Sequence, residues 1–181
     1  MRLEIDTCTV EIDENATREY YAAHIGGKND CQCAECRNFR AAAPLVSEKV
    51  KAFFRDCGID DMLDFVELTP YSSEKGDYLY GGWYHLVGSI EGGKSPKIWL
   101  PPAARMRRIF YKLFNREKYE ALVRATEDLS NERTSGILKL DECFSVRFSN
   151  GKDLIAKDFP ENCIQLDIDA KLPWVIEERP E

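Results

Sequence analysis

Residues 77–91 read Asp-Tyr-Leu-Tyr-Gly-Gly-Trp-Tyr-His-Leu-Val-Gly-Ser-Ile-Glu and form a long run of strand-forming residues. Aromatic and β-branched side chains favour strands because they pack well on a pleated surface. Alternation along a strand would place Trp83 and His85 on one face of a sheet and Tyr84 on the other. Flanking strands are expected at residues 64–71 and 97–100. This part of the chain therefore predicts an antiparallel sheet.

The segments on either side complete the pattern of an α+β fold. Alternating apolar and polar residues predict further strands, at residues 3–6, 9–13, 144–148 and 164–168. A period of about 3.6 predicts helices at residues 15–24, 30–43 and 47–57. Strands and helices do not alternate regularly, as they would in a doubly wound parallel sheet. We expect a mostly antiparallel sheet with helices packed on it.

A second helical region interrupts the strands. Between residues 101 and 131, apolar residues recur at helical spacing before and after Asn115, which predicts an inserted helical hairpin. A chain of 181 residues has the usual length of one domain. We expect residues 1–181 to form a single α+β domain with residues 101–131 as an insertion.

Composition restricts the classes of function. The start of the chain lacks a signal peptide, and no stretch approaches the roughly 18 apolar residues of a membrane span, so we expect a cytoplasmic protein without a membrane partner. Seven cysteines are an odd number, which favours free thiols or metal ligands over a disulfide framework. A net charge of −7 disfavours nucleic acid as a partner.

The most specific chemical feature is the cysteine group Cys31, Cys33 and Cys36. Three soft sulfur atoms within six residues can bind one zinc ion at about 2.3 Å, and a tetrahedral ion then needs one further donor. His24 is the nearest candidate for that donor. Other candidates lie elsewhere in the chain, namely Cys57, His85, Cys143 and Cys163.

Two other interpretations of these cysteines remain open. They can be reduced thiols that pack as small apolar side chains. A redox pair formed by Cys33 and Cys36 at the start of a helix is the second alternative, because a helix N-terminus stabilises a thiolate. A redox motif of this type usually follows a strand, whereas here a Gly-Lys-Asn-Asp loop precedes it.

A phosphate-binding pattern also occurs, from Gly88 to Ser95, but its context argues against nucleotide binding. Such a loop leads directly into a helix, whose N-terminus holds the phosphates. Here Pro96 and the strand-like residues 97–100 follow instead. The acidic stretch 137–142 is a poor partner strand, since Lys139 interrupts it. We expect a hairpin turn and no bound nucleotide.

Two segments are candidate binding surfaces. Trp83, Tyr84 and His85 can form an aromatic contact surface, because Tyr and Trp combine a large area with a hydrogen-bonding tip. The alternative is a strand whose aromatic residues pack in the core. In the inserted hairpin, the basic residues Arg105, Arg108 and Lys112 share one helical face. That face can bind an acidic partner or can simply be solvated.

Three short pieces resemble an uncharacterised family of small bacterial cytoplasmic proteins. They are Cys31-x-Cys33-x-x-Cys36-Arg-Asn-Phe39, Gly81-Gly-Trp-Tyr-His85 and Leu172-Pro-Trp-Val175. The resemblance implies a small α+β domain, with residues 101–131 as an insertion. The family has no known activity, so it supplies no catalytic residue.

Two hypotheses of function follow. The first is a noncatalytic binding or protein-interaction domain with an unidentified protein partner and a structural zinc, for instance a protein that neutralises a toxin. The second is a thiol- or zinc-dependent enzyme centred on Cys31, Cys33 and Cys36. Three thiolates and a water molecule would leave zinc the open position that catalysis requires.

Overall fold

The computed structural model describes residues 1–24, 31–71, 77–94, 110–112, 115–121 and 132–178. Its sheet has the strand order β1-β2-β4-β7-β6-β5, with β3 paired to β4 in addition. The strands are β1 (Arg2–Ile5), β2 (Cys8–Ile12), β3 (Glu67–Tyr71), β4 (Asp77–Gly92), β5 (Leu138–Lys139), β6 (Phe144–Ser149) and β7 (Cys163–Pro173). All pairings between these strands are antiparallel, which confirms the predicted α+β class and antiparallel sheet.

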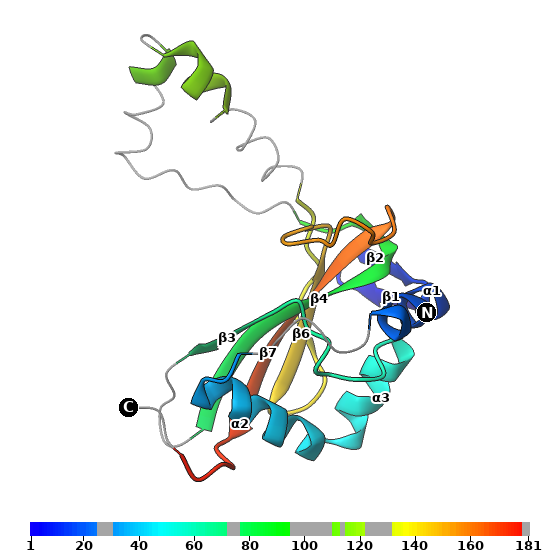
Figure 1. Ribbon diagram of the computed structural model, residues 1–181. Helices are drawn as coiled ribbons and strands as arrows, with labels where there is room; N and C mark the ends of the chain where they lie inside the picture. The colour runs from blue at the N-terminus through cyan, green and yellow to red at the C-terminus, as the bar shows by residue number, and fades with distance from the viewer. Residues whose placement is uncertain (25–30, 72–76, 95–109, 113–114, 122–131, 179–181) are drawn as a thin grey trace.

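Strand β4 organises the sheet, because it pairs with three other strands (Figure 1). One edge pairs with β7 along residues 77–87. The opposite edge is shared, since residues 79–83 pair with β3 and residues 88–92 pair with β2. A short stretch of this edge therefore lies between the ends of two partner strands.

Helix α1 (Glu14–Ala23) supplies the hydrogen bonds for that stretch. The Tyr21 hydroxyl donates to the carbonyl of His85 at 2.9 Å and accepts from the N–H of the same residue at 3.2 Å. The N–H of Val87 donates to Thr17 Oγ1 at 3.0 Å, and its carbonyl accepts from the N–H of Asp13 at 2.8 Å. Side chains of α1 and the backbone of its N-cap thus replace a strand.

Helices α2 (Ala34–Ala42) and α3 (Glu48–Asp56) cover one face of the sheet (Figure 1). Phe39 of α2 packs on Tyr80, with ring centroids 5.2 Å apart. Phe54 of α3 packs on Tyr84 at 5.2 Å and on Phe144 at 5.6 Å. Edge-to-face pairs of this kind add to the free energy gained by burying the rings. The main core lies between these two helices and the sheet.

Part of the opposite face is covered by the chain between β6 and β7. Phe159 in this segment packs on Tyr20 at 4.4 Å and on His85 at 5.6 Å. Trp83 lies on the same face, and its Nε1 donates to the carbonyl of Asp153 at 3.3 Å. The two faces of β4 are therefore occupied as the alternation of residues 83–85 predicts.

Several boundaries differ from the sequence-based expectation. The N-cap of α1 is Asp13, whose carboxylate accepts from the N–H of Ala16 at 3.0 Å, so the helix begins at Glu14, one residue before the expected start at residue 15. The expected strand at residues 64–71 begins only at Glu67. Residues 97–100 and most of the predicted hairpin at 101–131 lie outside the described residues. Within that hairpin, residues 110–112 and 116–121 are helical.

In the part of the chain that the structure describes, no helix combines the length and the apolar character that spanning a membrane requires.

Candidate metal centre

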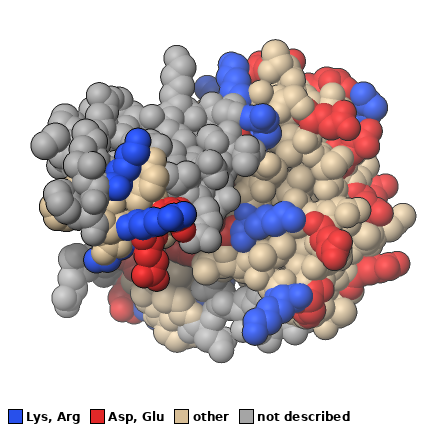
Figure 2. Space-filling view, turned by 90° about the horizontal axis from the view of Figure 1, so that it is seen from above, with Lys and Arg blue, Asp and Glu red and all other residues tan. Residues whose placement is uncertain are grey.

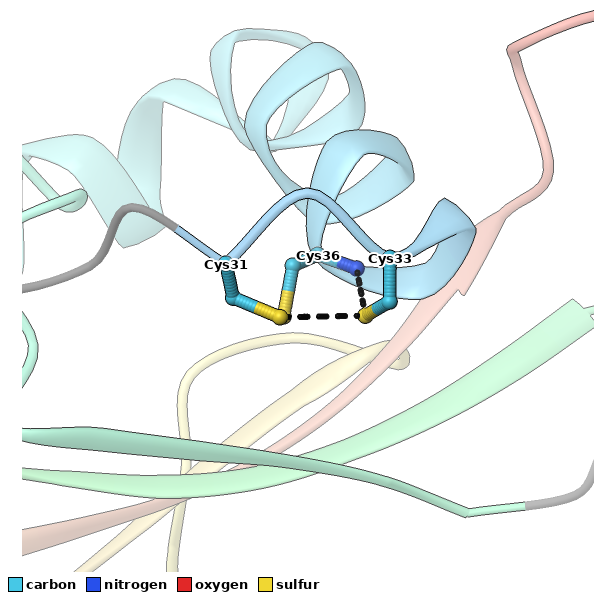
Figure 3. Close-up of side chains that lie close together, drawn as sticks. All are labelled: Cys31, Cys33 and Cys36. Carbon is cyan, nitrogen blue, oxygen red and sulfur yellow. Dashed lines mark hydrogen bonds between the residues drawn. The ribbon is translucent and has the colours of Figure 1, made fainter.

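The sulfur atoms of Cys31, Cys33 and Cys36 lie within 4.8 Å of one another at the start of α2 (Figure 3). Cys31 belongs to the segment that enters the helix, Cys33 is the N-cap, and Cys36 lies in the first turn. The thiol of Cys31 donates to the sulfur of Cys33 at 3.4 Å. The group is thus preformed by local backbone geometry and combines soft donors of the kind that bind zinc and similar ions.

The capping role of Cys33 explains why this spacing brings the sulfur atoms together. Its backbone is extended, and its Sγ accepts from the N–H of Cys36 at 3.5 Å. An N-cap side chain turns back toward the first turn to satisfy a helical N–H that has no intrahelical partner. The N-cap and the third helical residue therefore place their side chains at the same end of the helix.

The three thiols differ in exposure and in acidity. Cys31 and Cys33 are exposed, whereas Cys36 is buried. Hydrogen bonds from the backbone N–H and then the side chain of Cys33 lower the pKa of Cys31, and a weaker contribution comes from the charge of Arg40. Burial, followed by the neighbouring sulfur atoms, raises the pKa of Cys36 to about 12. A bound metal ion must therefore displace a proton from Cys36 in particular.

Asn38 fixes the position of this helical turn against the sheet. The side chain is buried, and its Nδ2 donates to the Tyr80 hydroxyl at 2.9 Å and to the carbonyl of Pro173 at 3.0 Å. Its Oδ1 accepts from the N–H of Val175 at 2.7 Å. The Tyr80 hydroxyl in turn donates to the carbonyl of Glu35 at 3.1 Å. The first turn of α2 is thereby attached both to β4 and to the segment after β7.

Two arginine side chains of α2 attach neighbouring segments of the chain to this helix. Arg40 donates to the carbonyl of Cys31 at 2.6 Å and so connects the entering segment to the helix. Arg37 forms an ion pair with Glu178 beyond the end of β7. The positive charge of Arg40 favours the thiolate form of Cys31, which is the form that binds metal ions.

His24 is not a member of this sulfur group. Its Nδ1 lies 2.7 Å from the carbonyl of Tyr20, and its Nε2 lies 2.7 Å from the Asp158 carboxylate. The imidazole also stacks on the Tyr20 ring at 4.2 Å. In this arrangement His24 fastens α1 to the segment between β6 and β7.

The other candidates for a fourth ligand also lie outside the group. Cys57, Cys163 and His85 are buried in the core, and Cys143 is exposed beside β6. Among the described residues, the site therefore has three donors, all of them sulfur.

The predicted aromatic surface is occupied by core packing. Tyr84 has an exposed fraction of 0% and His85 of 2%, and Trp83 is partly buried against the segment between β6 and β7. Burial raises the pKa of the Tyr84 hydroxyl, which donates to the carbonyl of Met62. The alternative interpretation, aromatic residues of a strand packed in the core, describes Tyr84 and His85 correctly.

The predicted basic surface is described only in part. Lys112 is exposed in the helical residues 110–112, while Arg105 and Arg108 lie outside the described residues. On the face shown in Figure 2, Lys and Arg side chains lie among Asp and Glu side chains. Charges of both signs are therefore interspersed there.

Most of the phosphate-loop pattern belongs to the sheet. Gly88 to Gly92 form the end of β4 and pair with β2. The N–H of Gly88 donates to the carbonyl of Asn162 at 2.8 Å. Ser95, the last residue of the pattern, lies outside the described residues. Gly88 and Gly92 of this pattern thus belong to the pairing of β4 with β2.

Sequence reasoning missed the contribution of Asn38. The available signal was a polar residue at a position where α2 turns its apolar face inward, between Cys36 and Phe39. A buried polar side chain needs hydrogen-bond partners. Those partners lie about 40 and 135 residues away along the chain, so no local pattern identifies them.

The chain matches no protein-family model, no curated protein and no solved structure in the comparisons.

Proposed function

We propose that the protein is a noncatalytic interaction domain that binds zinc through Cys31, Cys33 and Cys36. The observation that carries the proposal is the convergence of three sulfur atoms within 4.8 Å at one helix end. Tetrahedral zinc with bonds of about 2.3 Å requires sulfur atoms about 3.8 Å apart, so small side-chain rotations suffice. The zinc would join the entering segment to α2.

The same proposal includes a protein partner that binds near the zinc site. Two of the three sulfur atoms are exposed, and the adjoining segment after β7 carries the exposed side chain of Val175. A metal that orders the entering segment would present this surface in one conformation. The seven free cysteines favour a reducing compartment, which supports action in the cytoplasm.

Metal analysis of the untagged protein, purified without added metal and washed with a weak chelator, tests the proposal. The expected result is about one zinc per chain, together with loss of zinc in Cys33→Ser. Cys143→Ser is the matched control, because Cys143 is exposed but lies outside the sulfur group. Zinc-free protein that also fails to take up zinc from a defined buffer would contradict the proposal.

A second candidate function is a zinc- or thiol-dependent enzyme. The favouring observation is that the described residues supply three sulfur donors and no fourth, which would leave a bound zinc open to water. The lowered pKa of Cys31 also suits a nucleophilic thiolate. Rapid modification of Cys31 by iodoacetamide at neutral pH, compared with Cys143, tests the thiol form. Equal rates at the two cysteines would count against it.

A further inference from the structure

We propose that Cys31, Cys33 and Cys36 also form a receptor for trivalent arsenic, bound as a three-sulfur complex. This inference rests on the three-sulfur site of the proposed function and names a second class of ligand for it. It depends on the number, charge and exposure of the donors.

The number of donors favours this ion. The described residues bring together three sulfur atoms, and His24 is occupied by Tyr20 and Asp158. Zinc in structural sites takes four protein ligands. Trivalent arsenic is a soft centre that keeps a lone pair and forms three bonds in a trigonal pyramid. Three converging thiols therefore satisfy it without any further residue.

The net charge of the complex also favours arsenic over zinc. Arsenious acid reacts with three thiols according to As(OH)3 + 3 RSH → As(SR)3 + 3 H2O. Each As–O bond is replaced by an As–S bond, each thiol proton leaves in a water molecule, and arsenic stays in the trivalent state. The product is uncharged, whereas zinc with three thiolates and water carries a net charge of −1.

The difference in net charge between the two complexes is important because one of the three sulfur atoms is buried. The sulfur of Cys36 is buried, and burying an uncompensated charge is costly. Arg40, a cation on the same helix, already donates to the carbonyl of Cys31 at 2.6 Å. An uncharged complex requires no additional cation, so its bound form is compatible with the contacts that are present.

The exposure of the thiols provides a route for the ligand. Cys31 and Cys33 are exposed and their sulfur atoms lie 3.4 Å apart, so a small neutral molecule can react with them first. Cys36 lies beneath them in the first helical turn and can supply the third bond. The exposed pair would form the outer edge of the pyramid, and the buried sulfur its inner corner.

Native mass spectrometry of the full-length, metal-free protein after addition of sodium arsenite provides the test. We expect one arsenic per chain, with a mass gain of one arsenic atom less three hydrogen atoms. A complex with two sulfur atoms retains one hydroxyl group and is heavier by one water molecule. Predominance of that heavier species would overturn the proposal.

Cys31→Ser is the informative variant, because Cys31 is exposed and precedes the helix, so α2 does not depend on it. We expect this variant to lose the three-sulfur species and to bind arsenite more weakly by about tenfold or more. Cys143→Ser should behave like the unmodified protein. Arsenite binding that is unchanged in Cys31→Ser would overturn the proposal.

Zinc binding measured on the same samples separates the two proposals. Protein that binds zinc but not arsenite would refute the arsenic inference and leave the proposed function standing. Protein that forms the three-sulfur arsenic species but takes up no zinc would refute the zinc function alone. Protein that binds neither ion would refute both.

Discussion

Asn38 and Val175 are joined by a hydrogen bond in which the N–H of Val175 donates to the Asn38 side-chain oxygen at 2.7 Å. This contact links the helix that carries the sulfur group to the segment after β7, 137 residues further along the chain. Two of the three short sequence pieces noted above, around Cys36 and Pro173, thus meet in space. The third piece, around Trp83, lies in β4. Strand β4 pairs with β7, the strand that ends at Pro173.

Replacement Asn38→Ala should destabilise the protein by roughly 2 to 4 kcal/mol, since it leaves the Val175 N–H, the Pro173 carbonyl and the Tyr80 hydroxyl without this partner. Urea unfolding followed by circular dichroism measures the change. Arg37→Ala on the same helix is the control, and we expect it to cost less than about 1 kcal/mol, because its ion pair with Glu178 is largely exposed. Equal losses in the two variants would contradict this account.

Tyr21→Phe tests the stretch of the β4 edge that lies between the ends of β2 and β3. The substitution removes only the hydroxyl, and both backbone groups of the buried His85 then lose a hydrogen-bond partner. We expect a loss of about 1 to 3 kcal/mol in the free energy of unfolding. Tyr71→Phe serves as the comparison, because Tyr71 is 52% exposed, and its loss should be close to zero. A Tyr21→Phe protein as stable as the unmodified one would show that the hydroxyl does not hold this edge.

The Cys163 thiol gives a prediction for alkaline pH. Burial raises its pKa from 9.0 to about 11, so between these values the folded state binds a proton that the unfolded state has released. Its contribution to stability is therefore fully present below about pH 9 and is lost as the pH rises toward 11. In Cys163→Ala, unfolding free energies measured from pH 8 to pH 11 should fall less steeply. Identical slopes in Cys163→Ala and in the unmodified protein would refute the assignment.

His24→Ala should loosen the segment between β6 and β7 without affecting metal binding. The substitution removes the contact with Asp158 and the stacking on Tyr20, and for a partly exposed pair we expect a cost of less than about 1 kcal/mol. Amide hydrogen exchange should accelerate in residues 153–159, and the zinc content should stay the same. Asp158→Asn should give a similar exchange pattern. Loss of zinc in His24→Ala alone would show that His24 does act as a ligand.

The sequence sufficed for features that depend on local patterns. The strands β1 and β2, the helix that begins after Ser47 and the alternation of residues 83–85 were all predicted, because each follows from short-range periodicity. The sulfur group was also visible in the sequence, since its geometry is set within one helical turn.

Features that depend on distant contacts were not predictable in this way. Nothing in residues 77–91 indicates that one edge of β4 is shared by β2 and β3. Nor does it indicate that Tyr21 and Thr17 bind the β4 backbone between these two strands. The sequence favours His24 as the fourth ligand because it is close to Cys31 along the chain. Its position is decided instead by Tyr20 and by Asp158, 134 residues away.

The adjacent residues Gly81 and Gly82 provide a paired test of how β3 and β4 approach each other. A Cβ atom on Gly82 would lie 2.4 Å from the backbone carbonyl oxygen of Glu67, which is fixed by strand pairing. A Cβ atom on Gly81 would lie 2.9 Å from the ring of Tyr71, which is half exposed and free to rotate outward. We therefore expect Gly82→Ala to lower the free energy of unfolding by about 1 to 3 kcal/mol, and Gly81→Ala by less than about 1 kcal/mol. Thermal unfolding of the two variants measures the difference. Equal or reversed losses would mean that the backbones of β3 and β4 are not held this closely, because a displaced backbone costs more free energy than a rotated side chain.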